Sequence, residues 1–164
     1  MGGAARPAFY LDLGSPEAYL SAERVLQVMP VAVEWVPVHA AGLPGGDPFG
    51  AFRCAEERDI ALARVERTAA RRGLQPVRWP DPFPFDSAYA MRVATYARQI
   101  GRTVAFALAA FRQAYAGGRS LEVSENVLIA ASACEMHPRA VLKALESRRV
   151  REQLDEYTER AGSA

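Results

Sequence analysis

One turn near the N-terminus constrains the fold more than any other feature of the sequence. The apolar stretch over 8–13 leads directly into Gly14, Ser15 and Pro16. Glycine ends a strand, serine is a favoured helix N-cap, and proline suits the first position of a helix. We therefore predict a strand over 8–13 and a helix over 16–29 whose N-terminus carries the Ser15 hydroxyl.

A second strand follows this helix. Pro30 ends the helix, and the apolar residues over 31–38 predict a buried strand. Two strands joined through a helix normally pair in parallel, with a right-handed crossover. The first 38 residues therefore predict a β-α-β unit, in which the helix turns Leu20, Leu26 and Met29 toward the core.

The rest of the sequence is helical in pattern. A loop rich in glycine and proline covers 40–49, and a proline-rich segment over 75–85 must be extended or turning. We predict helices over 49–72, from Asp86 or Ser87 to 100, over 104–115, from about 124 to 134, from 138 to 145, and over 146–160. No segment after Val38 predicts a strand. We expect a single domain over 1–164, with a β-α-β core (1–40), a helical insertion (41–147) and a final helix (148–164).

Composition limits the classes of partner and site. The chain has 164 residues, half of them apolar, and a net charge of +1, which does not suggest a nucleic-acid or membrane partner. No apolar run approaches the roughly 18 residues of a membrane helix, and residues 1–7 lack the apolar core of a signal peptide. We expect a cytoplasmic protein. Cys54 and Cys134 are expected to be free core thiols, and two histidines argue against a four-ligand zinc site, so we expect no metal.

Two stretches of the sequence resemble a known family. The first is the strand with Phe9 and Tyr10 followed by Asp12-x-x-Ser15-Pro16-x-x-Tyr19-Leu20. The second is the proline-rich run over 79–86, followed by Ala90-Met91-Arg92 and the apolar helix over 106–115. Together they resemble the 2-hydroxychromene-2-carboxylate isomerase and kappa-class glutathione transferase group of the DsbA-like thioredoxin superfamily. The resemblance covers residues 7–161.

The resemblance implies an α/β fold, with a thioredoxin-like β-α-β core and a large all-helical insertion. In that family the chain continues with a cis-proline loop, a β-hairpin and a last helix. This sequence ends at Ala164, where that segment would start, so we expect a C-terminally truncated fold. An incomplete sheet beside an apolar helical domain would expose apolar surface, which a second copy could cover. We therefore expect a homodimer.

The Ser15 turn also limits the chemistry. DsbA-like oxidoreductases carry Cys-x-x-Cys in this turn, whereas this chain has Ser15-Pro16-Glu17-Ala18. Dithiol exchange is impossible there without cysteine. A helix N-terminus still favours an external thiolate, to which the serine hydroxyl can donate a hydrogen bond. The resemblance implies glutathione or another low-molecular-weight thiol as cofactor, with Ser15 catalytic and Ser15 and Pro16 binding the thiol. The alternative is that Ser15 is only an N-cap.

Other candidate residues flank the proline-rich segment. By resemblance, Arg78, Trp79 and Asp86 line the pocket of a small-molecule substrate, and Arg78 could bind a carboxylate. Each also has a structural alternative. Arg78 could simply be an exposed arginine, Trp79 a hydrophobic anchor and Asp86 a helix cap. We expect Tyr19 to be a core residue and His39 to be structural.

The sequence thus favours a thiol-dependent isomerase or transferase of the 2-hydroxychromene-2-carboxylate isomerase type. The alternative is a non-catalytic, truncated thioredoxin-fold protein that acts in binding or assembly. A DsbA-like dithiol oxidoreductase is the least favoured function, because Ser15 and Ala18 replace both cysteines.

Overall fold

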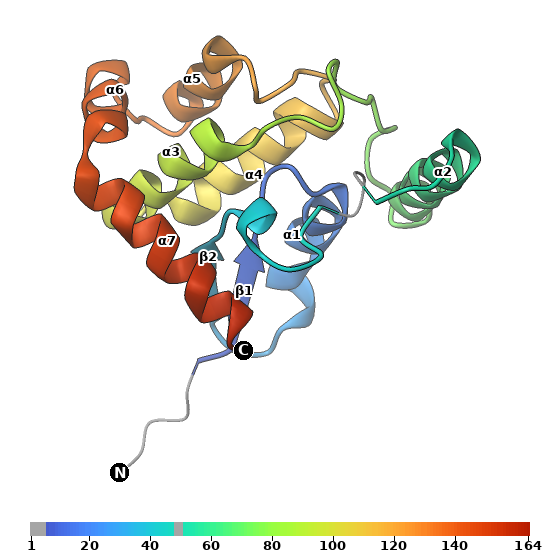
Figure 1. Cartoon of the computed structure of the whole chain (residues 1–164), viewed down its shortest axis with the longest axis horizontal. Helices are drawn as coiled ribbons and strands as arrows, with labels where there is room; N and C mark the ends of the chain where they lie inside the picture. The colour runs from blue at the N-terminus through green and yellow to red at the C-terminus, as the bar shows by residue number, and fades with distance from the viewer. Residues whose placement is uncertain (1–5, 48–50) are drawn as a thin grey trace.

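The computed structural model describes residues 6–47 and 51–164 (Figure 1). Its elements follow the predicted order closely. They are β1 (Ala8–Leu11), α1 (Pro16–Val28), β2 (Glu34–Pro37), a short 3-10 helix η1 (Ala40–Gly42), α2 (Ala55–Arg71), α3 (Ala88–Gln99), α4 (Thr103–Tyr115), α5 (Ser124–Ala133), α6 (Pro138–Glu146) and α7 (Arg148–Gly162). The predicted α/β class, with a β-α-β unit followed by helices, is confirmed.

The sheet has two strands in the described part of the chain, β1 and β2, and they pair in parallel. The register places Ala8 opposite Glu34 and Leu11 opposite Pro37. Both strands are shorter than predicted, since pairing stops at Leu11 and begins only at Glu34. Because the strands are parallel, both carboxyl ends lie at the same edge of the sheet, where ligands commonly bind in α/β folds.

Helices cover the sheet on both sides (Figure 1). The helix α1 packs on α4 and α2, and α7 packs on α3 and β2. The apolar helix predicted over 104–115 corresponds to α4, which places Phe106, Phe111 and Tyr115 in the core with no exposed surface. In Figure 1, α2 extends to the right of the other elements.

The start of α2 differs from the prediction. The sequence predicts that this helix begins at residue 49. Phe49 lies outside the described residues, and residues 51–54 are not helical. The helix begins at Ala55 with Cys54 as its N-cap. The Glu57 carboxylate accepts a hydrogen bond from the Arg53 backbone N–H at 3.1 Å, which satisfies a donor outside the helix and fixes its first turn.

The inner face of α1 is also shorter than predicted. Tyr19 and Leu20 are buried, but Leu26 is 60% exposed and Met29 is 37% exposed. Beyond the first two turns, the contact with α4 is polar, because Arg112 forms a two-bond ion pair with the Glu23 carboxylate at 2.6 and 2.9 Å. The last apolar residues of α1 therefore face outward.

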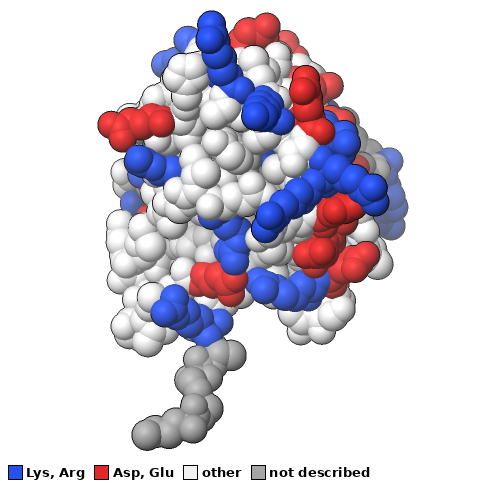
Figure 2. Space-filling model, turned by 90° about the vertical axis from the view of Figure 1, so that its left-hand side faces the viewer, with Lys and Arg blue, Asp and Glu red and all other residues white. Residues whose placement is uncertain are grey.

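Charged side chains tie α7 to the sheet. Arg160 lies 3.3 Å from the Glu34 carboxylate on β2, and its guanidinium lies over the Tyr10 ring of β1. Arg98 on α3 pairs with the same carboxylate, which lowers the pKa of Glu34. Figure 2 shows the face on the left of Figure 1, where blue and red side chains are interspersed.

Two further properties follow from the helices. Cys134 is buried as expected, but Cys54 is exposed at the N-terminus of α2, so the prediction of two core thiols is wrong for Cys54. None of the described helices has both the length and the apolar character that a transmembrane span requires.

Candidate active site

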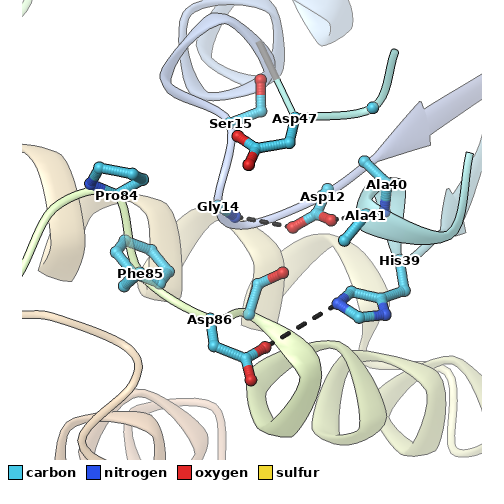
Figure 3. Close-up of a pocket in the computed structure, with 12 residues that line it drawn as sticks. Asp12, Gly14, Ser15, His39, Ala40, Ala41, Asp47, Pro84, Phe85 and Asp86 are labelled. Atoms are coloured by element: carbon cyan, nitrogen blue, oxygen red, sulfur yellow. Dashed lines mark hydrogen bonds and ion pairs between the residues drawn. The ribbon is translucent and has the colours of Figure 1, made fainter. Parts of the chain in front are cut away.

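A pocket of about 420 Å³ opens at the carboxyl ends of the two strands (Figure 3). It is formed by three segments: the turn after β1, the connection after β2, and the residues that lead into α3. Its lining comprises Asp12, Gly14, Ser15, His39, Ala40, Ala41, Gly46, Asp47, Pro84, Phe85, Asp86 and Ser87. The parallel pairing of β1 and β2 brings the first two segments together.

Ser15 stands at the N-terminus of α1, on the wall of this pocket. Its backbone is extended, and its Oγ accepts a hydrogen bond from the Ala18 N–H at 3.1 Å. The predicted N-cap is therefore confirmed. Among the described residues, the hydroxyl hydrogen has no acceptor, so it can be donated to a ligand. The positive end of the helix dipole favours an anion at the same place.

Asp12 connects two of the three segments that form the pocket, the turn after β1 and the segment after β2. One carboxylate oxygen accepts the Gly14 N–H at 2.8 Å, and the other accepts the Ala40 N–H at 2.7 Å. Asp12 is only 7% exposed. These charge-assisted bonds connect the turn after β1 to η1 after β2, and the Asp12 carbonyl also accepts the Ser15 N–H at 3.0 Å. Asp12 therefore accepts hydrogen bonds beneath the turn.

Leu13 anchors the turn to the helical layer. Its N–H lies 3.2 Å from the Met91 sulfur of α3, and its carbonyl accepts the Tyr115 hydroxyl of α4 at 3.1 Å. Burial raises the pKa of Tyr115 well above its usual value, and the nearby Asp12 carboxylate adds to the effect. The phenol therefore stays protonated and continues to donate to Leu13.

His39 lies on the pocket wall formed by the segment that follows β2. Its backbone N–H donates to the Thr158 Oγ of α7 at 3.0 Å. Its ring Nε2 lies 3.9 Å from the nearest carboxylate oxygen of Asp86, and the ring is about one third exposed. The Asp86 carboxylate also accepts the N–H of Ala88, the first residue of α3, at 2.9 Å, although Ser87 occupies the N-cap position. Figure 3 shows the His39 ring directed at Asp86.

The charges of the described lining are mostly negative. Asp12, Asp47 and Asp86 contribute carboxylates, and neither lysine nor arginine lines the pocket. Since both Asp12 oxygens already accept backbone N–H groups, that charge is well solvated by the protein. The pocket thus combines an anion-favouring helix N-terminus at Ser15 with a rim that favours a positively charged ligand group.

Two predicted substrate residues lie elsewhere. Arg78 is exposed. Its backbone N–H donates a hydrogen bond to the Tyr115 carbonyl at 2.8 Å, which holds the backbone at this position. Trp79 packs against Phe83 and Tyr115 and donates from its ring nitrogen to Glu66 at 2.7 Å. Neither belongs to the described pocket lining, whereas Ser15 and Asp86 both do.

Sequence reasoning missed the position of His39 beside Asp86. They are 47 positions apart in the numbering and come from different segments, so no local pattern could join them. The available signal was the end of a predicted parallel strand, where functional side chains gather.

The described residues provide no site for metal binding, and no site for disulfide chemistry at the pocket. No cluster of three His, Cys, Asp or Glu side chains suited to a metal ion occurs in residues 6–47 and 51–164. No cysteine lines the pocket as described. The arrangement can instead bind an anion at Ser15 and present an imidazole on another wall.

The DSBA-like thioredoxin domain matches residues 8–164 of the chain. No curated protein matches it by sequence. Among solved structures, a 2-hydroxychromene-2-carboxylate isomerase aligns with a TM-score of 0.79 and 18% identity, over 95% of this chain and 78% of the other. A protein named as a probable DsbA oxidoreductase, from Streptomyces coelicolor, aligns with a TM-score of 0.72 and 19% identity, over 96% and 75% of the two chains. These likenesses describe the fold.

Proposed function

This chain belongs to the DSBA-like thioredoxin domain family, and we propose that its pocket binds a low-molecular-weight thiol, such as glutathione, as the thiolate. The bound thiolate attacks a small electrophilic molecule, as in a thiol-dependent isomerase or transferase. Ser15 is the catalytic residue that stabilises the thiolate, and Pro16 shapes the turn beside it. Asp86 faces the electrophile.

The observation that carries this proposal is the Ser15 hydroxyl at the N-terminus of α1. It lies on a pocket wall, and its hydrogen is not committed to another described group. A hydrogen bond to a charged acceptor contributes about 1.5–3 kcal/mol, which favours the thiolate over the thiol. The name of one structural neighbour, 2-hydroxychromene-2-carboxylate isomerase, suggests the class of reaction.

The alternative is a binding or assembly protein that keeps the fold without catalysis. Ser15 as a simple N-cap would be sufficient for that function. Dithiol oxidoreduction is the least supported function, because serine and alanine occupy the ends of the Ser15–Ala18 turn. Binding of a thiol would distinguish the proposed function from a protein in which Ser15 is only an N-cap. Consumption of an electrophile would distinguish a catalyst from a protein that only binds the thiol.

Calorimetric titration tests the proposal directly. We expect the wild-type protein to bind a thiol, and Ser15→Ala to bind it about 10- to 150-fold more weakly, the equivalent of a lost bond to a charged group. The titrants are glutathione, cysteamine and 3-mercaptopropionate. The carboxylates of the rim predict that cysteamine, which carries an amine, binds more tightly than 3-mercaptopropionate, which carries a carboxylate.

Two further variants separate thiol binding from helix capping. Ser15→Thr keeps both the cap and the hydroxyl donor, so it should bind the thiol nearly as well as wild type. Ser15→Asp keeps the cap but places a carboxylate against the thiolate, so it should fold normally and not bind. Equal thiol affinity in wild type and Ser15→Ala, or no heat with any thiol, would refute the proposal.

We also propose that the protein is a homodimer. The segment from Leu26 to Val31 carries apolar side chains that are 37–60% exposed, namely Leu26, Val28, Met29 and Val31. A contiguous exposed apolar segment of this kind is typical of an interface. Sedimentation equilibrium should give a dimer, and Leu26→Glu should shift it to the monomer, while Ile129→Glu on α5 should not. A wild-type monomer at every concentration contradicts the proposal.

A further inference from the structure

The pocket holds one titratable ring that the proposed function has not used, His39. Its backbone is fixed by the hydrogen bond to Thr158 of α7, and Thr158 is itself fixed by donating to the Leu154 carbonyl at 2.8 Å. The ring is directed toward Asp86 (Figure 3). Ser15 and His39 thus line the same cavity from different segments.

His39 is the lining residue best suited to transfer a proton. Both Asp12 oxygens accept backbone N–H groups, one Asp86 oxygen accepts the Ala88 N–H, and Asp47 is engaged in an interaction of its own. Histidine commonly serves as a general acid or base in catalysis. The described lining contains no other histidine, and it has no lysine, tyrosine or cysteine.

A thiolate that adds to a conjugated carbonyl compound requires a proton at a second place. The sulfur forms a bond to the β-carbon, the carbon–carbon double bond gives its electron pair to the carbonyl, and an enolate results. For the addition product to form, the enolate must gain a proton at the α-carbon, which is bonded to the carbon that now carries the sulfur. A proton donor apart from Ser15, within the same pocket, meets this requirement.

We propose that His39 is the general acid that protonates this enolate, with Asp86 as the positioning residue that stabilises the imidazolium. The inference rests on the proposed function of Ser15. The imidazolium gives its proton to the α-carbon, and the neutral ring regains one from water, which received the proton of the ionising thiol. In the reverse elimination His39 removes the α-proton as the thiolate leaves.

Two electrophiles with different proton requirements test this role. Benzalacetone is a conjugated ketone, so thiol addition needs a proton at carbon. Chlorodinitrobenzene loses chloride when the thiolate attacks, so it needs none. With the thiol that binds most tightly, we expect His39→Gln to lower the rate with benzalacetone by about 100-fold or more, as for a lost general acid, and to leave the rate with chlorodinitrobenzene within about twofold.

The chain offers a matched control in its second histidine. His137 is exposed and caps α6 by accepting the Arg139 N–H, so His137→Gln should change neither rate. Asp86→Asn should lower the benzalacetone rate by a smaller factor than His39→Gln. Ser15→Ala, in contrast, should lower both rates.

The outcomes distinguish this inference from the proposed function. If wild type accelerates neither reaction, the proposed function fails and the role of His39 fails with it. If His39→Gln lowers both rates equally, or neither, while Ser15→Ala lowers both, then Ser15 acts as proposed and His39 is not the acid. Calorimetry with the thiol should give the same affinity for His39→Gln and wild type.

Discussion

Replacing Tyr115 with alanine is expected to lower the free energy of unfolding by about 3–5 kcal/mol, the range for removing a large aromatic side chain from a core. Tyr115 has no exposed surface. Its ring stacks on Tyr19 at 5.5 Å between centroids and also contacts Phe111 and Phe85. The cavity left by alanine would lie where α1, α4 and the proline-rich segment meet, so several elements would lose packing together.

Urea denaturation followed by circular dichroism measures this loss, with Tyr115→Phe as the matched variant. Phenylalanine keeps the ring and removes only the hydroxyl that donates to the Leu13 carbonyl. We expect Tyr115→Phe to lose about 1–1.5 kcal/mol, the net value of a typical hydrogen bond. If phenylalanine destabilised the protein as much as alanine, the bond to Leu13 would dominate over ring packing, contrary to our expectation.

The elements of the fold could be predicted because their signals are local. Gly14, Ser15 and Pro16 mark the end of β1 and the start of α1, and the structure has both within a few residues of the prediction. Gly73 and Gly101 follow the ends of α2 and α3 with positive φ angles, which glycine adopts without strain. Each such boundary depends on a few neighbouring residues, and these are visible in the sequence.

One error arose where tertiary contacts decide. Leu26 continues the apolar pattern of α1, but the Glu23–Arg112 ion pair shows that the face toward α4 has become polar at that point. The apolar pattern of α1 alone does not indicate which residues of α4 it will contact. The start of α2 was misplaced for a different reason, since the bond that accompanies it, from Arg53 to Glu57, is local.

The candidate site was predicted in part for the same reason. Ser15 is found in its own turn, and the sequence identified it as the N-cap. The pocket residues beyond that turn come from distant segments. Asp86 was expected there only by resemblance, and the position of His39 depends on the pairing of the strands. Trp79, which lies in the predicted region, instead packs on Tyr115.

The second large effect is expected for Asp12→Ala, which should destabilise the protein by about 3 kcal/mol or more. Two bonds to a charged acceptor contribute about 1.5–3 kcal/mol each, and their loss leaves the Gly14 and Ala40 N–H groups without an acceptor. Asp12→Asn keeps one acceptor oxygen and should lose less. Asp86→Ala removes an exposed carboxylate with a single backbone bond, so it should lose less than either.

The Asp12 variants also test whether the pocket is one unit. Asp12 connects the turn that carries Ser15 to the segment that carries His39, although neither side chain bonds to it. In Asp12→Asn at a temperature where the protein remains folded, we expect weaker thiol binding and a lower benzalacetone rate together. Calorimetry and the two-electrophile assay measure both. If the stability falls but both functional values stay at the wild-type level, Asp12 supports the fold without setting the geometry of the pocket.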